Sequence, residues 1–280
     1  MAMKLVEKFA PYTDEVFKEE SKTSLITNKD FDWTGAHTVS IWKISTVPLN
    51  DYTRNVNDDS GEDANISRYG KLRDLSTQTE EMLLKKDRSF IFNIDKLDAD
   101  ETAGQLTAAT ALSRELREVV IPEVDKYVYG VMAAGAGTKA TKALTKSNIY
   151  DEILLGTEEL DNAEVPEHDR VIIVSPATYK LLKQANIFDN TEVAANMRRL
   201  GVVGMIDGNT VIKVPLNRLP ENFGFMIIHP SATVAPTKLE DYNIHTDTPL
   251  SSGSIVTGRI SYDAFVMENK KKGIYFLSIA

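Results

Sequence analysis

Apolar residues between Thr102 and Ala134 recur at steps of three, four and one positions, so they fall on one face of a helix. Charged residues fall on the opposite face. Thr102 is expected to cap the start of this helix, with Gln105 completing a capping box. Pro122 lies inside the stripe and cannot donate a backbone hydrogen bond. The unbroken stripe favours one long helix with a kink at Pro122, and two consecutive helices are the alternative.

Two strand-like regions precede this helix and are separated by a long polar stretch. Residues 36–47 form the first region, and residues 71–86 and 88–95 form the second. The intervening residues 48–70 are rich in Asn, Asp and Arg and have no hydrophobic period. The pattern predicts a hairpin that reaches away from the body and carries both signs of charge at its tip. A solvated loop of similar composition is the alternative.

Helical and strand-like patterns alternate over residues 145–235, which predicts a small α/β or α+β unit. Asn148 and Ser175 are expected to be helix N-caps, and a hairpin is expected to turn at Asp207–Gly208–Asn209. The first of these helices is expected to bury four residues: Ile149, Ile153, Leu154 and Leu160.

The C-terminal part returns to strands. Residues 253–269 have the pattern of one long strand, bent at Gly258. Its buried face is expected to consist of Val256, Ile260, Tyr262 and Ala264. A lysine-rich turn and a last strand, Ile274 to Ile279, follow.

The N-terminal residues 1–35 are polar or only weakly amphipathic, with few apolar positions. They are not expected to form a core alone. They are expected to be an arm that lies on another surface, and a frayed terminus is the alternative.

Composition excludes several classes of function. The chain has 280 residues, of which 42% are hydrophobic, and a net charge of -9. An acidic chain does not bind nucleic acid through its overall field. The absence of cysteine excludes disulfides and thiolate metal sites. No signal peptide or membrane span is expected, so a soluble cytoplasmic protein is predicted.

No catalytic constellation emerges from the sequence. The four histidines, His37, His168, His229 and His245, lack metal-ligand spacing, and no phosphate loop, calcium loop or nucleophile elbow is complete. We therefore expect no enzymatic activity, no cofactor and no metal. Glu123 lies near the apolar stripe of the long helix and is expected to find a partner across a subunit or domain contact.

The order of these parts, with the phrases SPATYKLLK, GMIDGNTVIKVP, FGFMIIHPSA and GSIVTGRISYDAFVMENKKKGIYFL, resembles the major capsid proteins of tailed bacteriophages with the HK97-type fold. The resemblance implies an α+β fold with an N-arm, an extended E-loop hairpin, a P domain with a long spine helix, and an A domain of mixed sheet and helices.

The implied parts follow the chain in order. They are an arm at 1–35, the E-loop hairpin and P-domain strands at 36–98, the spine helix and linker at 99–144, the A domain at 145–244, and returning strands at 245–280.

The resemblance implies a structural subunit that assembles with copies of itself, as pentamers and hexamers, into an icosahedral shell enclosing double-stranded DNA without sequence-specific binding. The expected location is the virion capsid, assembled in the bacterial host cytoplasm and without a membrane. A portal and a separate scaffold protein, or no scaffold, are the further partners expected. Intersubunit contacts are expected at five residues of the hairpin: Arg54, Asp58, Asp59, Arg68 and Arg73.

Two other classes stay open at this point. One is an encapsulin-like compartment, which shares the fold and would hold cargo enzymes. The other is a small-molecule enzyme built on residues 145–235, which would need a cleft with converging polar groups.

Overall fold

The computed structural model describes residues 21–28, 38–52, 54, 68–69, 73–75, 77–96, 107–188, 202–246 and 252–280. The chain divides into two compact units. The larger unit contains residues 1–34 and 85–280, and the smaller one contains residues 35–84. Each unit is treated separately below.

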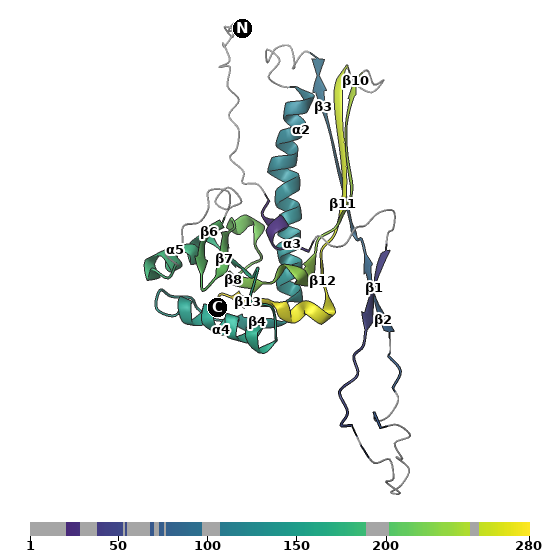
Figure 1. The fold of residues 1–280 in the computed structure, drawn as a ribbon. Coiled ribbons are helices and arrows are strands. Elements are labelled where there is room, and N and C mark those ends of the chain that lie inside the picture. The colour runs from purple at the N-terminus through teal and green to yellow at the C-terminus, as the bar shows by residue number, and fades with distance from the viewer. Residues whose placement is uncertain are drawn as a thin grey trace. The chain divides into compact units, whose positions relative to one another are not determined.

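A long helix runs through the larger unit as three consecutive segments, α2 (Ala108–Glu115), η2 (Leu116–Val120) and α3 (Ile121–Gly135) (Figure 1). Thr107 caps its start in a capping box with Thr110. The capping residues predicted from the sequence, Thr102 and Gln105, lie outside the described residues.

Pro122 does not divide the helix, so the alternative of two separate helices is wrong. The segment just before it, η2, is a π-helical turn, in which the N–H of Ile121 donates to the carbonyl of Leu116. Because proline removes one donor and crowds the preceding turn, a wider turn at this point lets the helix continue. The predicted disturbance at Pro122 therefore takes the form of a π-helical turn.

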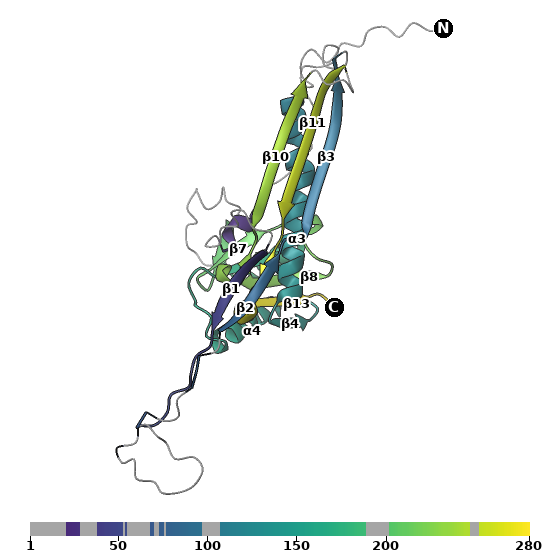
Figure 2. The ribbon, with the colours of Figure 1, turned by 90° about the vertical axis from the view of Figure 1, so that its right-hand side faces the viewer.

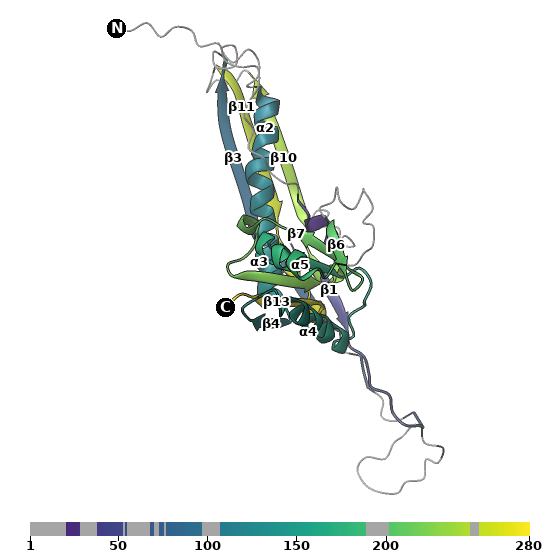
Figure 3. The same cartoon turned by 90° about the vertical axis from the view of Figure 1, so that its left-hand side faces the viewer.

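Three antiparallel strands lie along the long helix, in the order β10 (Thr237–Thr246), β11 (Gly253–Tyr262) and β3 (Lys86–Asp95). Figures 2 and 3 show this pairing of helix and sheet from opposite sides. The buried positions of β11 include Val256, Ile260 and Tyr262, as predicted. In β3, Phe90, Phe92 and Ile94 are more buried than the residues between them, which confirms their shared face.

The strand predicted over residues 253–269 is too long. β11 ends at Tyr262, and the next pair, β12 (Phe265–Val266), joins β9 (Thr233–Val234) in a separate ladder. The break comes at Asp263, whose buried carboxylate accepts hydrogen bonds from the Tyr127 hydroxyl and the Lys85 backbone N–H.

A six-stranded mixed sheet forms the other part of the larger unit (Figure 1). Its strands, in spatial order, are β4 (Thr138–Thr141), β13 (Ile274–Ser278), β8 (Phe223–Ile228), β5 (Val171–Val174), β7 (Asn209–Lys213) and β6 (Val202–Ile206). Residues Val128, Tyr129 and Met132 of α3 share a core with one face of it. The opposite face shares a core with α4 (Ile149–Asn162) and α5 (Pro176–Ala185).

Most local predictions in this sheet region are confirmed. Ser175 accepts a hydrogen bond from the N–H of Thr178 at the start of α5. Asp207 and Gly208 both have positive φ, as a type I′ turn requires. Leu154 is one exception, because it is 40% exposed and does not share the buried face of Ile149, Ile153 and Leu160. Asn148 precedes α4, but its side chain accepts from the N–H of Thr145 instead of capping the helix.

Four short 3₁₀ segments complete the larger unit: η1 (Thr23–Leu25), η3 (Leu216–Arg218), η4 (Pro230–Ala232) and η5 (Glu268–Gly273).

The smaller unit contains two antiparallel strands, β1 (Thr38–Ile44) and β2 (Thr77–Leu83). Their register runs from Thr38 opposite Leu83 to Ile44 opposite Thr77. An ion pair of 2.9 Å joins Lys43 to Glu80 across the ladder. The strand predicted at residues 36–47 therefore pairs with the returning strand β2, whereas residues 88–95 belong to β3, which pairs with β11 in the larger unit.

Candidate interaction surfaces

The described residues contain no group of three or more histidine, aspartate or glutamate side chains placed to hold a metal ion. Within the same ranges, no helix is both long and apolar enough to cross a bilayer. The candidate functional features of the described residues are exposed surfaces, a groove and buried charged groups.

Two of the four histidines, His168 and His229, are in contact although they are far apart in the sequence. The rings of His168 and His229 lie 5.8 Å apart, edge to face. The N–H of Ser231 donates to Nδ1 of His229, so the other ring nitrogen carries the proton. Burial lowers the pKa of His229, and the neighbouring His168 acts in the same direction. His37 lies outside the described residues.

Arginines and tyrosines mark the part of the smaller unit beyond β1 and β2. Arg54, Arg68 and Arg73 are all exposed. Asp58 and Asp59, the other two predicted contact residues, lie outside the described residues. The rings of Tyr52 and Tyr69 pack edge to face with centroids 5.2 Å apart.

This tyrosine pair links the outgoing and returning segments of the hairpin. The side-chain amide of Asn50 donates to the carbonyl of Tyr69 at 3.3 Å, which adds a second link. Tyr52 and Tyr69 remain 53% and 78% exposed. Sequence reasoning did not single them out, although two tyrosines in an otherwise polar stretch were a signal that could have been used.

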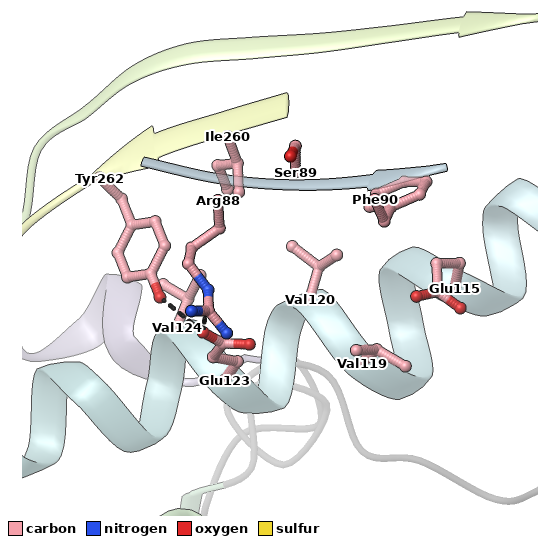
Figure 4. A pocket seen from close by; sticks show the side chains of 10 residues that line it. All are labelled: Arg88, Ser89, Phe90, Glu115, Val119, Val120, Glu123, Val124, Ile260 and Tyr262. Atoms are coloured by element: carbon pink, nitrogen blue, oxygen red, sulfur yellow. Dashed lines mark hydrogen bonds and ion pairs between the residues drawn. The ribbon is translucent and has the colours of Figure 1, made fainter. Parts of the chain in front are cut away.

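A groove of about 180 Å³ lies between β3 and the long helix in the larger unit (Figure 4). Its apolar lining includes Phe90, Val119 and Ile260. Figure 4 shows Tyr262 at one end of the groove and Glu115 at the other. Two of the lining residues, Val119 and Val120, belong to the π-helical turn.

Glu123 lies in this groove and pairs inside its own unit. Its carboxylate is 2.9 Å from Arg88 of β3 and accepts a hydrogen bond of 3.4 Å from the hydroxyl of Tyr262. Burial, followed by the charge of Glu123, raises the pKa of Tyr262 to about 12. The prediction that Glu123 finds a partner across a subunit or domain contact is therefore wrong, because Arg88 supplies that partner from the adjacent strand.

A second carboxylate, Asp263, ties the start of β3 to the end of β11. It accepts hydrogen bonds from the hydroxyl of Tyr127 at 2.7 Å and from the backbone N–H groups of Lys85 and Ala264, each at 2.8 Å. Burial and the bond to Asp263 raise the pKa of Tyr127. Tyr127 belongs to α3, so one buried side chain holds helix and sheet together.

A buried ion pair lies near the middle of the long helix. Arg218 of η3 donates to Asp125 of α3 at 2.8 Å, and both side chains are almost fully buried. Ser21 donates to the other oxygen of the Asp125 carboxylate, and Lys22 donates to the carbonyl of Lys213. Burial raises the pKa of Asp125, while Ser21 and Arg218 act against that shift.

Residues 21–28 are bound to the body of their own chain. Ile26 is fully buried in the core beside α3. The N–H of Asn28 donates to the carbonyl of Thr233 at 2.8 Å. Residues 21–28 therefore lie on another surface, as expected, and that surface is the body of their own chain, where one buried isoleucine and three polar contacts anchor them. Residues 1–20 lie outside the described residues.

Neither a search against protein-family models nor one against curated sequences finds a match. Solved structures do match over nearly the whole chain. A structure from Mycobacterium phage Che8 is 18% identical with a TM-score of 0.75, covering 98% of this chain and 96% of that one.

Two further matches are phage capsid structures. The capsid structure of the cyanophage P-SCSP1u is 14% identical with a TM-score of 0.72, covering 98% of this chain and 93% of its own. The mature capsid of bacteriophage PhiM1 is 13% identical with a TM-score of 0.71, and the match covers 99% of this chain and 92% of that one. The chain therefore has the fold of these phage capsid structures.

Proposed function

We propose that this protein is the major capsid subunit of a tailed bacteriophage, with the HK97-type fold. The observation that carries the proposal is the match to phage capsid structures over 98% of this chain and more than nine-tenths of theirs. In this proposal the protein is not an enzyme and its activity is assembly.

The parts of the chain take roles accordingly. The long helix α2–η2–α3 is the spine of the P domain, and the six-stranded sheet with α4 and α5 is the A domain. The pair β1–β2 with the stretch between them is the E-loop. Residues 1–35 are the N-arm, which is anchored to its own subunit through residues 21–28.

The partners are first of all other copies of the chain, as pentamers and hexamers of a closed icosahedral shell. A net charge of -9 suits a wall that encloses double-stranded DNA without holding it tightly. A portal and, where one is used, a separate scaffold protein would complete the assembly in the host cytoplasm.

Contacts between subunits involve the hairpin in this proposal. Arginine and tyrosine are enriched at the residues that dominate protein interfaces, and both are exposed there. Arg54, Arg68 and Arg73 would make these contacts together with Asp58 and Asp59.

Negative-stain microscopy and sedimentation of the purified full chain test the proposal. We expect closed particles with a mass of many subunits. A species with the mass of one chain under every condition of salt, pH and concentration would contradict it. Particles that hold protein cargo and no DNA when isolated from their natural source would instead indicate an encapsulin-like compartment.

A further inference from the structure

The groove between β3 and the long helix is large enough to take one aromatic ring. Its volume is about 180 Å³, and a protein cavity of roughly 150 Å³ is known to hold benzene. Val119 in its lining is 48% exposed. Apolar surface of this kind gains free energy when a second apolar group covers it.

The π-helical turn contributes part of the groove. Such turns occur often at functional positions. Here the turn lies just before Pro122 in the sequence and supplies Val119 and Val120 to the lining.

The chain carries a group that matches the groove in size and polarity. Tyr52 and Tyr69 present exposed rings whose hydroxyls could remain at the solvent edge. Arginines stand close in sequence to both, Arg54 two residues after the first and Arg68 one residue before the second. In sequence, the pair is thus flanked by Asp51 and Arg54 at Tyr52 and by Arg68 at Tyr69, so the positive charge is adjacent only to Tyr69.

The charges of the groove are complementary to those arginines. Arg88 and Glu123 neutralise each other at 2.9 Å. Glu115 remains as the acidic group at the end of the groove distant from Tyr262 (Figure 4). An arginine next to an inserted tyrosine would meet a carboxylate there, and opposite charges at an interface fix the register of the two partners.

We propose that the groove lined by Phe90, Val119 and Ile260 receives one ring of the Tyr52–Tyr69 pair from a second copy of this chain, with Arg54 or Arg68 beside Glu115. This inference rests on the proposed function, since it names the surface that the hairpin contacts in the assembly.

Cross-linking between two single-cysteine variants tests this contact directly, because the natural chain contains no cysteine. Full-length Tyr69→Cys is mixed with full-length Val119→Cys under assembly conditions and treated with a short bis-maleimide. Since neither variant carries both thiols, a mixed dimer can form only between copies. The control replaces the second variant by Leu216→Cys, an equally accessible position at 62% exposure on η3.

We expect the mixed 69–119 dimer in at least tenfold excess over the 69–216 dimer and over either variant alone. Equal yields would overturn the inference. Particles that form without the 69–119 product would contradict the inference and leave the proposed function standing. The complete absence of particles would contradict both.

Filling the groove gives a second, independent measurement. Val119→Trp should reduce particle yield at least tenfold while the far-ultraviolet circular dichroism of the subunit stays unchanged. The double variant Tyr52→Ala/Tyr69→Ala should do the same, and combining all three changes should add little, because each removes the same contact. Leu154→Trp on α4, at a residue 40% exposed, is the matched control and should assemble normally. Normal assembly of Val119→Trp would overturn the inference.

Discussion

Arg218 and Asp125 are 93 residues apart in the chain, yet they form an ion pair of 2.8 Å in which both side chains are almost fully buried. The pair joins η3 to the middle part of the long helix. Ser21 uses the second carboxylate oxygen, so the same aspartate also holds the start of the anchored N-terminal segment. One buried carboxylate thus connects three parts of the chain that are remote in sequence.

Removing one member of this pair should be costly. Arg218→Met leaves Asp125 buried without its cation, and breaking a buried ion pair in this way costs about 3–5 kcal/mol. We expect the free energy of unfolding in urea to fall by that amount. The double variant Asp125→Leu/Arg218→Met should recover part of the loss, because it buries no unpaired charge. A double variant less stable than Arg218→Met would contradict this account.

His229 should make stability depend on pH. Its folded-state pKa is lowered, first by burial and then by His168, with Arg170 and Lys270 acting in the same direction and Asp169 against it. The folded state therefore binds the proton less strongly than the unfolded state. The stabilisation is complete above the unfolded pKa of 6.5 and is lost as the pH falls through the lowered folded value.

Unfolding at about pH 7.5 and about pH 5 measures this effect. His229→Asn keeps an acceptor for the N–H of Ser231 and removes the titration, so its loss of stability between the two pH values should be smaller than that of the natural chain. His245→Asn, at an exposed position on β10, is the control and should leave the pH dependence unchanged. If His229→Asn and the natural chain lost the same amount of unfolding free energy between the two pH values, His229 would not be the source of the pH dependence.

Gly258 is needed because an aromatic ring lies on its backbone. A Cβ built there would come within 2.2 Å of the ring of Phe90, its partner across β3 and β11. Gly258→Ala must push that ring away from Tyr242, against which it stacks at 6.2 Å. Overpacking of this kind costs about 1–3 kcal/mol, which a thermal or urea unfolding curve would detect.

Two variants check that interpretation. Adding Phe90→Ala to Gly258→Ala should make the glycine substitution nearly neutral, because the clash is gone. Gly130→Ala, inside α3 with nothing within 4 Å of the added methyl group, should stabilise by about 0.5–1 kcal/mol. A large loss from Gly258→Ala in the absence of Phe90 would show that the ring is not the cause.

Charge reversal on the hairpin should impair assembly without unfolding the subunit. Arg54, Arg68 and Arg73 are exposed, so changing all three to Glu leaves the core intact. We expect the triple variant to remain folded by circular dichroism and to form few particles in sedimentation. Reversal of Lys270, Lys271 and Lys272 on η5 is the control for net charge. If the hairpin variant formed normal particles, these arginines would not contribute to the contact between subunits.

The proposed contact residues were predicted only in part. Arg54, Arg68 and Arg73 are exposed, which suits an interface and a solvated loop equally, so their role in a contact stays a prediction. The groove could not be foreseen, because Phe90, Val119 and Ile260 come from three separate elements. Glu123 was noticed, yet its partner Arg88 is 35 positions away on a strand whose register no local pattern defines.

The sequence by itself determined the local elements: the stripe of the long helix, the cap at Ser175, and the turn at Asp207–Gly208. These depend on interactions between residues a few positions apart, and periodicity records such interactions directly. Only the tertiary structure decided which remote groups meet, as in Asp125 with Arg218 and Tyr52 with Tyr69. Those pairs exist because strands and helices pack in one particular register, and the energy that selects a register is distributed over the whole core rather than recorded near either residue.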